Sequence, residues 1–341
     1  MREPAFWYRP SSWISLLLTP LGAVYGFAAA LRLQRPGFGA GVPVLCVGNY
    51  HTGGAGKTPT VLALAKVLRD LGETPVVLSR GYGGRLQGPV KVDPARHAAG
   101  DVGDEPLMLA QTVSVVVARD RVDGVALARS QGASVILMDD GFQNPAIAKD
   151  ASLIVIDGDR GLGNGRVFPA GPLRAPLPPQ LARTDALIVI GDGKAADAVA
   201  DAINAQDKPV LRARLKPDAA SAASLSGKRV LAFAGIGDPR RFFRTLRGSG
   251  IEVVRERVFP DHHPYSASEI DALAADAARD GLTLVTTEKD LVRLRGGAGL
   301  PDRTRDIVAF AVSLAFEEDA RLRKFVADRL FQARQNKFRR D

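Results

Sequence analysis

The sequence has very little cysteine, which limits the kinds of protein that it can encode. Its 341 residues contain one cysteine, Cys46, so the chain cannot form an internal disulfide, and a reducing compartment suits it. Cys46 lies within an apolar run, where we expect a small buried core residue. Zinc-ligand spacing, internal repeats and a serine-nucleophile motif are also missing. The sequence therefore excludes a disulfide-stabilised scaffold and gives no sign of a zinc finger or a serine hydrolase.

Aromatic residues are also few, at 6% of the chain. The net charge of +9 by itself suits a nucleic acid, an anionic membrane surface or a polyanionic substrate equally well. Proteins that bind single strands combine basic residues with aromatic stacking platforms, whereas the basic residues of this chain are scattered. We therefore expect no nucleic-acid partner.

Charged residues are absent from the N-terminal stretch between Pro10 and Leu31. Arg2, Arg9, Arg32 and Arg35 flank this stretch, with Trp7, Tyr8 and Trp13 at one end. Pro20, Gly22 and Gly26 interrupt it as a spanning helix, and it lacks the cleavage site of a signal peptide. Two interpretations remain open: a helix inserted into one membrane leaflet, or a helix buried against the protein's own core. Together with the positive net charge of the chain, this pattern favours a cytoplasmic protein that rests on an anionic membrane surface.

A glycine-rich turn follows the apolar strand that begins at Val42, and it ends in Gly56-Lys57-Thr58. In such a loop, glycines let backbone N–H groups surround a polyphosphate, and the next helix adds its positive N-terminal end. We predict that Lys57 reaches the β- and γ-phosphates of ATP and that Thr58 places its hydroxyl on Mg²⁺. The predicted nucleotide-binding residues are His51, Thr52, Gly53, Gly54, Ala55, Gly56, Lys57 and Thr58. His51 replaces the first glycine of the usual pattern, and a chance turn at a strand end is the alternative.

After this loop, apolar runs typical of strands alternate with helical patterns. The runs are Pro75–Leu78, Val113–Val117, Val135–Met138, Leu153–Ile156 and Ala186–Ile190, and then Arg229–Phe233, Ile251–Val254, Leu282–Val285 and Ile307–Phe310. Their alternation with helices predicts an α/β fold, with a P-loop NTPase-type parallel sheet and flanking helices. The later runs contain no second phosphate loop, so they predict a second, smaller α/β domain.

Charged residues follow several of these strands, at the sheet edge where ligands gather in parallel α/β folds. Asp139 and Asp140 end one run; we assign Asp139 to Mg²⁺ and Asp140 to catalysis, leaving open which lies nearer the ion. A turn or a helix cap is the ordinary alternative for such a pair. Arginines that follow two other runs suit a phosphate or carboxylate on the acceptor, the alternative being solvated surface side chains. They are Arg80, Arg85, Arg119 and Arg121.

Another acidic pair, Asp104 and Glu105, precedes Pro106 and a helical run. Read locally, Asp104 could simply cap that helix. Beside a phosphate site, its carboxylate could instead accept the proton of an acceptor hydroxyl that attacks the γ-phosphate. Asp104 is therefore a candidate general base.

Together these motifs resemble those of the tetraacyldisaccharide 4′-kinases, the lipid A 4′-kinases of Gram-negative bacteria. The resemblance covers nearly the whole chain. The motifs that carry it are Val47–Asn49, Gly53–Pro59, Ser79–Gly83, Gly103–Pro106, Ala118–Arg121, Asp139–Gln143, Phe168–Arg174, Ala234–Ile236, Pro239 with Arg241 and Phe242, Asp261 with His262, and Thr287–Asp290. Two positions depart from the family pattern: His51 stands where threonine is usual, and Ala175 where an acidic residue is common.

The resemblance implies transfer of the ATP γ-phosphate to the 4′-hydroxyl of a tetraacylated glucosamine disaccharide 1-phosphate, at the cytoplasmic face of the inner membrane. It implies ATP and Mg²⁺ as cofactors, and we expect a monomer on the membrane surface. Asp104 matches the family's proposed base, and His262, rather than the adjacent His263, matches its partner because it directly follows Asp261. The metal ligands carried over are Thr58, Asp139 and Glu105, and the substrate-binding residues are Asn49, Arg80, Tyr82, Arg119, Arg121, Gln143 and Arg174.

Three parts of the chain are expected. Residues 1–36 would form the apolar membrane-associating helix, 37–216 the P-loop kinase domain, and 217–341 a smaller domain with a basic tail. Because the smaller domain lacks its own phosphate loop but carries His262, we expect it to close over the site and exclude water.

Two other functions remain as alternatives. A membrane-associated P-loop switch ATPase would combine a similar loop with a membrane helix, but that family places a lysine before the Gly-Gly pair, where this chain has Thr52. A soluble kinase or ATP-dependent ligase for a small acid would use the same sheet and arginines. Such an enzyme has no need to expose an apolar N-terminal helix, which distinguishes it from the membrane-associated kinase.

Overall fold

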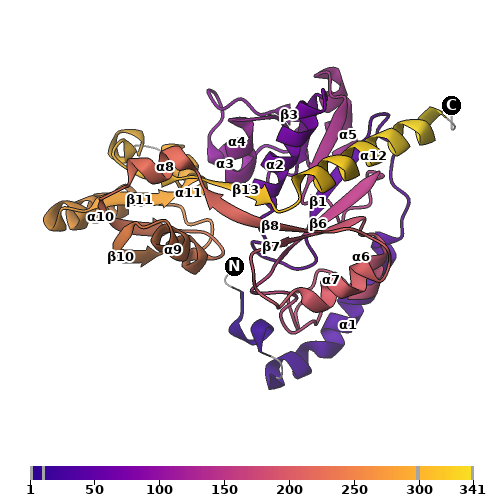
Figure 1. Ribbon diagram of the computed structural model, residues 1–341, viewed down its shortest axis with the longest axis horizontal. Helices are drawn as coiled ribbons and strands as arrows, with labels where there is room; N and C mark the ends of the chain where they lie inside the picture. The colour runs from indigo at the N-terminus through magenta and orange to yellow at the C-terminus, as the bar shows by residue number, and fades with distance from the viewer. Residues whose placement is uncertain (1–2, 10–11, 297–299, 339–341) are drawn as a thin grey trace.

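The computed structural model describes residues 3–9, 12–296 and 300–338, and it places them in two lobes of unequal size (Figure 1). Arg2, Pro10 and the end of the predicted basic tail, Arg339 and Arg340, lie outside the described residues. Each lobe is built on its own sheet. Strands β8 (Val210–Pro217) and β13 (Val312–Phe316) lie side by side where the chain passes between the lobes.

The larger sheet contains nine strands within the described residues, in the order β13, β8, β7, β6, β1, β5, β2, β4, β3. Its other strands are β1 Val44–Gly48, β2 Pro75–Ser79, β3 Val90–Lys91, β4 Ser114–Val117, β5 Val135–Asp139, β6 Ala151–Asp157 and β7 Ala186–Ile190. Neighbours are parallel except for the edge pairs, β3 with β4 and β13 with β8. Because β1 lies between β5 and β6, the loop that follows β1 emerges near the middle of the sheet.

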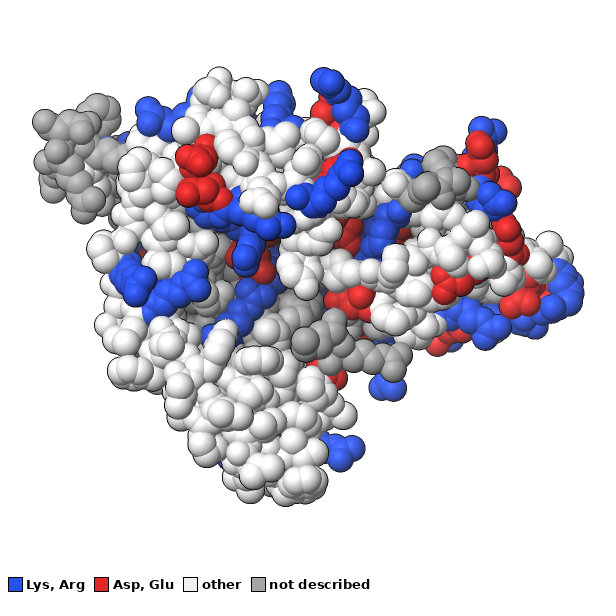
Figure 2. Space-filling model, turned by 180° about the vertical axis from the view of Figure 1, so that it is seen from behind, with Lys and Arg blue, Asp and Glu red and all other residues white. Residues whose placement is uncertain are grey.

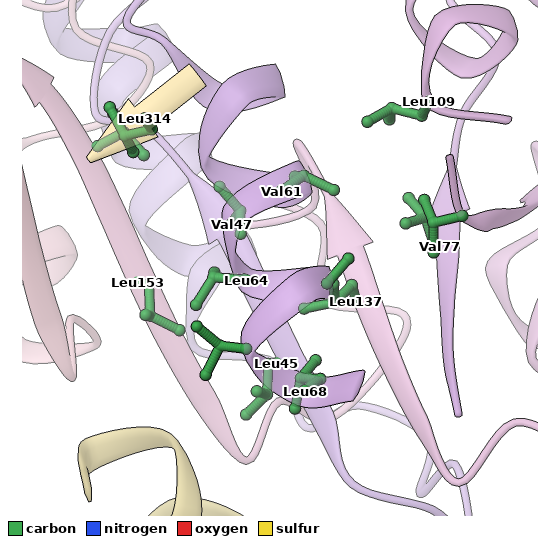
Figure 3. Close-up of a cluster of buried hydrophobic side chains, with 14 of the residues drawn as sticks. Leu45, Val47, Val61, Leu64, Leu68, Val77, Leu109, Leu137, Leu153 and Leu314 are labelled. Carbon is green, nitrogen blue, oxygen red and sulfur yellow. The ribbon is translucent and has the colours of Figure 1, made fainter. Parts of the chain in front are cut away.

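Helices cover both faces of this sheet, because successive side chains of its strands point to opposite faces. Leu45 and Val47 of β1 pack with Leu64 on one face, as Figure 3 shows, while Val44 and Cys46 pack on the other. The first face is covered by α2 Lys57–Asp70, α4 Asp104–Ala110 and α12 Asp319–Phe338, and the second by α5 Arg121–Ser130, α6 Leu177–Ala182 and α7 Asp197–Asn204. The short helix α3 spans Ala99–Val102. Both faces of the sheet are therefore covered and buried, as is usual for a parallel sheet.

The smaller lobe has a four-stranded parallel sheet in the order β10, β9, β11, β12. Its elements are α8 Ala219–Ser224, β9 Arg229–Ala234, α9 Pro239–Gly248, β10 Glu252–Val258, α10 Ala267–Asp280, β11 Thr283–Thr287, α11 Glu288–Arg295, the 3₁₀ helix η2 Pro301–Thr304 and β12 Val308–Phe310. Apolar side chains fill both faces of this sheet too, including Phe233 on one face and Phe243 on the other. The predicted α/β fold with a second, smaller domain is thus confirmed.

The end of the chain does not stay in the smaller lobe. Strand β13 pairs with β8 in the larger sheet, and Leu322, Val326 and Leu330 of α12 pack in the core of the larger lobe. The expected second domain running to residue 341 therefore ends earlier, because β13 and α12 belong to the first lobe. The alternating buried and exposed residues of β8 were not recognised as a strand in the sequence, and its partner β13 was missed with it.

The N-terminal segment forms the 3₁₀ helix η1 (Ala5–Tyr8) and the long helix α1 (Trp13–Leu33). Helix α1 packs through a narrow face against the loop between β6 and α6: Ser15 Oγ donates to Ala170 O at 2.6 Å, and Asn164 Nδ2 donates to Ser15 Oγ at 3.0 Å. Small residues let the backbone approach, since a Cβ at Gly22 would lie 2.9 Å from Val167 O. Most of the large apolar side chains of α1 point away from this contact and are exposed.

Candidate active site

The predicted phosphate loop joins the central strand β1 to helix α2. Gly53 and Gly56 have positive φ angles of 100° and 92°, which residues other than glycine rarely adopt, and α2 begins at Lys57 directly after Gly56. The N-terminal end of α2 therefore faces the loop and favours an anion there. The Lys57 ammonium is nearly buried and lies 3.8 Å from Asp140 Oδ1. The geometry fits the cradle for phosphates that the sequence predicted.

Two hydrogen bonds, one from a side chain and one from the backbone, hold this loop in place. Asn49 Nδ2 donates to Gly53 O at 3.2 Å, and the backbone N–H of Thr52 donates to Pro172 O at 2.9 Å. Asn49 is a predicted substrate contact; in this structure its side chain is fully buried and supports the phosphate loop. His51 Nδ1 lies 2.8 Å from Thr52 O, and burial lowers the pKa of His51 to about 4, so its ring is neutral near pH 7.

Asp140 lies at the end of β5 and is held by two cations. Arg174 donates from Nη1 to Oδ1 at 2.6 Å and from Nη2 to Oδ2 at 3.1 Å, and Lys57 approaches from the phosphate loop. Burial alone would raise the pKa of Asp140, but the charges of Lys57 and Arg174 outweigh it and hold the pKa well below its usual range. Its φ of 47° is left-handed, a conformation that strains a residue with a side chain and recurs at functional sites.

Asp139 is the more isolated carboxylate of the pair. It is 4% exposed, and its Oδ2 accepts a hydrogen bond from Ser79 Oγ at 3.4 Å. Burial, with the negative charges of Glu105 and Asp140 nearby, raises the pKa of Asp139 to about 7. A buried carboxylate beside two other carboxylates suits a bound Mg²⁺, which takes few protein carboxylates and keeps several waters. Among the described residues, no cluster of three or more His, Cys, Asp or Glu side chains is placed to hold a metal ion.

Asp104 begins helix α4 and meets His262 from the smaller lobe. The His262 Nδ1–Asp104 Oδ2 distance is 3.0 Å, although 158 positions separate the two residues in sequence. Lys289 Nζ lies 3.3 Å from the other ring nitrogen, and because an ammonium can only donate, His262 Nε2 accepts and Nδ1–H donates to Asp104. Like Asp140, His262 has a left-handed φ, here 58°. The two residues predicted as a catalytic pair are therefore in contact.

Cations of the smaller lobe surround both acidic residues of α4. Arg293 Nη2 donates to Asp104 Oδ2 at 2.6 Å, and Lys289 Nζ donates to Glu105 Oε1 at 3.0 Å. Burial raises the pKa of Asp104, but the His262 hydrogen bond and the charges of Lys289 and Arg293 prevail and hold that pKa well below its usual range. Glu105 behaves in the same way, because the charges of Lys289 and Lys57 outweigh burial and lower its pKa. Helix α4 also contacts α2, the helix that follows the phosphate loop, so these acidic residues lie beside that loop.

The remaining predicted substrate residues divide between the rim and the interior. Arg80, Tyr82 and Arg119 are exposed, and the Tyr82 ring lies edge-on to His262 with centroids 5.7 Å apart. Arg121 is buried instead, where its Nη1 donates to Ala118 O at 3.2 Å, so it does not face a substrate in this arrangement. Gln143 is half-buried and donates to Asn49 O at 2.8 Å. The rim therefore offers two arginines and one tyrosine to an incoming acceptor.

Sequence reasoning missed Lys289 and Arg293 as site residues, although Lys289 lies in a motif that it singled out. The two residues are four positions apart on α11, so they share one face of the helix. This spacing is a signal in the sequence, but only the fold shows that the shared face meets Asp104 and Glu105.

Known proteins resemble this chain along most of its length. The sequence pattern of the family described as tetraacyldisaccharide-1-P 4′-kinase matches residues 14–331. The tetraacyldisaccharide 4′-kinase of Bradyrhizobium diazoefficiens is 70% identical over 340 residues, with 100% of each chain covered. That of Rhodopseudomonas palustris strain BisB5 is 67% identical over 340 residues, again with 100% of each chain covered. The crystal structure of the "apo" form of LpxK from Aquifex aeolicus in complex with ATP has 27% identity and a TM-score of 0.72, covering 93% of this chain and 99% of that chain.

Proposed function

This chain belongs to the tetraacyldisaccharide 4′-kinase family, and from that premise we propose how its residues share the reaction. The chain is a kinase that transfers the γ-phosphate of ATP to the 4′-hydroxyl of a tetraacyl-glucosamine disaccharide 1-phosphate, a step of lipid A biosynthesis. The switch ATPase and the soluble ligase are thereby set aside. The distribution of roles within the site rests above all on one observation, the contact of Asp104 with His262 beside the phosphate loop.

Asp104 is the general base in this proposal. As the acceptor oxygen forms its bond to the γ-phosphorus, the bond from that phosphorus to the β,γ-bridging oxygen breaks, ADP leaves, and Asp104 takes the proton of the 4′-hydroxyl. A carboxylate with a depressed pKa is a weak base, so the proton moves late, after the bond to the leaving group has loosened. His262 donates to Asp104 and fixes the orientation of the carboxylate.

Lys57 and the amides of the phosphate loop bind the β- and γ-phosphates. The ammonium compensates the charge that develops on the transferring group and on ADP, which is the main electrostatic contribution in phosphoryl transfer. Asp140 and Arg174 hold Lys57 from the opposite side, since the Arg174–Asp140 pair fixes the carboxylate that Lys57 faces. Lys57 is thus oriented before ATP arrives.

Mg²⁺ is the expected metal, and the donors at this site fit it. Asp139 and the Thr58 hydroxyl would hold the ion, with Glu105 beside them, and it would neutralise phosphate charge when bound. The raised pKa of Asp139 supports this assignment, because a neighbouring divalent cation is what would keep such a carboxylate ionised. Arg80, Tyr82 and Arg119 at the rim would contact the phosphorylated disaccharide.

Helix α1 attaches the enzyme to the cytoplasmic face of the inner membrane in this proposal. It is the one helix among the described residues that is long and apolar enough to cross a membrane, and 17% of its most apolar window is buried. Exposed apolar residues recur along it at helical spacing: Trp13, Leu16, Leu17, Leu21, Val24, Phe27 and Leu31. Figure 2 shows that the lower end of the molecule, where α1 lies in Figure 1, has few charged side chains on that face.

The packing of α1 favours a helix that lies in one leaflet over a helix that spans the bilayer. Its contacts with the loop between β6 and α6 extend from Ser15 to Gly26, so one side of the helix is already occupied by protein along most of its length. A spanning helix would need lipid or apolar protein on every side. The exposed face would therefore rest among acyl chains beside the lipid substrate.

The smaller lobe closes over the site as a second domain. Four ion pairs that join the lobes support this view: Arg293–Asp104, Lys289–Glu105, Arg241–Asp157 and Arg244–Asp159. Closure would bring His262 to Asp104 and keep water from competing with the acceptor. The proposed catalytic residues Lys57, Asp104 and His262 meet within one chain, so a monomer would suffice for the reaction.

Transfer of labelled γ-phosphate from ATP to detergent-solubilised tetraacyl disaccharide 1-phosphate tests these roles. Asp104→Ala should bind ATP normally but lose transfer, whereas Lys57→Ala should lose both. ATP affinity is measured separately by equilibrium dialysis. A normal transfer rate for Asp104→Ala would exclude it as the base, and normal ATP binding by Lys57→Ala would exclude the phosphate assignment of the lysine.

A further inference from the structure

Helix α11 of the smaller lobe carries an arginine whose two terminal nitrogens face two different carboxylates. Arg293 Nη2 donates to Asp104 Oδ2 in the larger lobe at 2.6 Å, and Nη1 donates to Asp290 Oδ1 in its own lobe at 2.8 Å. The guanidinium is planar and rigid, so fixing one nitrogen fixes the direction of the other. The position of Asp104 is therefore tied to a residue on the far side of Arg293.

Asp290 is a firm support for this arginine. Its side chain is completely buried, and besides Arg293 it accepts hydrogen bonds from the Tyr265 hydroxyl at 2.9 Å, the Thr287 hydroxyl at 2.7 Å and the Gly235 amide. A buried carboxylate with all of these donors has no freedom to turn. The donors come from β11, from the loop before α10 and from the loop after β9. The position of Asp290 is thus fixed by three separate segments of the smaller lobe.

We propose that Arg293 is a positioning residue that acts through Asp104, and that Asp290 holds Arg293 in place for this purpose. The inference rests on the proposed role of Asp104 as the base. Oδ2 of Asp104 receives both Arg293 and His262, while Oδ1 receives the Glu105 amide at 2.9 Å. Without Arg293, Oδ2 keeps one donor, and the carboxylate can turn away from the acceptor hydroxyl.

This arrangement makes the base dependent on lobe closure. His262 and Arg293 both belong to the smaller lobe, so both donors leave Asp104 when the lobes separate. Asp104 would then be correctly oriented only in the closed enzyme, when the acceptor is shielded from water. Lys289 does not replace Arg293, because its ammonium lies 4.0 Å from Asp104 and is directed to Glu105.

A double-mutant cycle separates action through Asp104 from a general structural effect. Arg293→Gln and Asp104→Asn are prepared singly and together in the full-length enzyme. Single-turnover transfer is measured with labelled ATP and lipid substrate at saturation, over hours for the slow variants. We expect Arg293→Gln to lower the wild-type transfer rate about tenfold to a hundredfold, with ATP affinity within twofold of wild type. In the Asp104→Asn background, Arg293→Gln should cause no further loss of transfer rate.

Arg241→Gln is the matched control, because Arg241 also joins the lobes through a short ion pair, to Asp157 at 2.6 Å, but does not touch Asp104. Any loss that it causes should persist in full in the Asp104→Asn background. Arg293→Lys, which keeps the charge but cannot bridge both carboxylates, should transfer faster than Arg293→Gln and more slowly than wild type. If Arg293→Gln fails to bind ATP or melts early, Arg293→Lys takes its place in the cycle.

The two proposals fail in different ways. If Arg293→Gln slows the Asp104→Asn enzyme as much as it slows wild type, Arg293 does not act through Asp104, and the positioning role is wrong. If Asp104→Asn itself transfers at the normal rate, the base assignment fails first, and the positioning role falls with it. An unchanged rate for Arg293→Gln in the wild-type background would also overturn the positioning role.

Discussion

Arg174 and Asp140 form a two-pronged ion pair, with Nη1–Oδ1 and Nη2–Oδ2 distances of 2.6 and 3.1 Å. Arg174 comes from the loop between β6 and α6 that packs against α1, and Asp140 directly follows strand β5. The pair therefore connects the loop beneath α1 to the residue that faces Lys57. Because the sequence suggested only that Arg174 binds substrate, this internal contact is new information from the structure.

Replacing Arg174 should disturb Lys57 through Asp140. We expect Arg174→Gln to lower the transfer rate at least about tenfold, since Asp140 then loses its main restraint. Arg174→Lys should be intermediate, because an ammonium cannot make two parallel hydrogen bonds. Steady-state kinetics measure the effect, with Arg212→Gln as the control for an exposed ion pair, 3.4 Å from Asp197. Wild-type activity for Arg174→Lys would show that the paired geometry is unimportant.

The neutral, buried His51 should make the enzyme less stable in acid. The folded pKa of about 4 lies below the usual 6.5, so the unfolded chain takes up the proton first. The contribution of neutral His51 to the free energy of unfolding is fully present above pH 6.5. It is lost as the pH falls from 6.5 towards 4. At pH 5 the loss is about 2 kcal/mol.

Urea unfolding at pH 7.5 and pH 5, followed by circular dichroism, measures this loss. The variant His51→Gln lacks the titrating ring, so its free energy of unfolding should fall by about 2 kcal/mol less between these two pH values than that of wild type. Equal losses for the two proteins would mean that His51 is protonated in the folded state or is not buried in solution.

Much of the fold was predictable because its strands are buried on both faces. Runs such as Val135–Met138 are continuously apolar, and each predicted run coincides with a strand of the structure. The edge of the larger sheet was not predictable in the same way. Strand β8 alternates buried residues with exposed arginines. Its partner β13 follows the whole smaller lobe in the sequence, so the two paired strands are far apart along the chain. The position of β13 depends on tertiary pairing that no local pattern records.

The individual motifs of the site were predictable from the sequence, but the contacts between their side chains were not. The phosphate loop and the carboxylates after β5 follow from local patterns, whereas the pairing of Asp104 with His262 was inferred from family resemblance alone. Asn49 and Arg121, two predicted substrate contacts, are buried in the structure, because a polar residue at a strand end can turn inward to support a loop as readily as outward to a ligand. Burial decides between these two roles, and burial depends on the packed structure.

Membrane binding should depend on the exposed face of α1. Leu17 and Leu21 are 70% and 61% exposed and lie four residues apart on that face. The double variant Leu17→Asp, Leu21→Asp should bind vesicles of phosphatidylethanolamine and phosphatidylglycerol at least about a hundredfold more weakly, because each leucine contributes about 1.5 kcal/mol or more when buried. Vesicle sedimentation measures this. Phe331→Asp on α12, where the side chain is 63% exposed, is the matched control and should bind like wild type.

The opposite face of α1 should control the loop that carries Arg174. A Cβ at Gly22 would lie 2.9 Å from the carbonyl oxygen of Val167, which cannot move without disturbing the loop. We therefore expect Gly22→Val to push α1 and the loop apart. The hydrogen bonds from the Gly171 amide to Val167 O and from the Leu173 amide to Arg166 O should then open more often.

Hydrogen–deuterium exchange measures this opening at the two amides, and kinase assays with detergent-solubilised substrate measure its consequence. Exchange should accelerate in Gly22→Val, and the transfer rate should fall in the same direction as in Arg174→Gln, because Asp140 loses its restraint in both variants. Ala23→Val is the matched control, since Ala23 is the next residue of the same helix but its side chain is exposed. If Gly22→Val exchanged like Ala23→Val while its activity fell, α1 would influence catalysis by another route than the loop. If neither changed, the seam between α1 and the loop would be loose in solution, and the helix would serve the membrane without reaching the site.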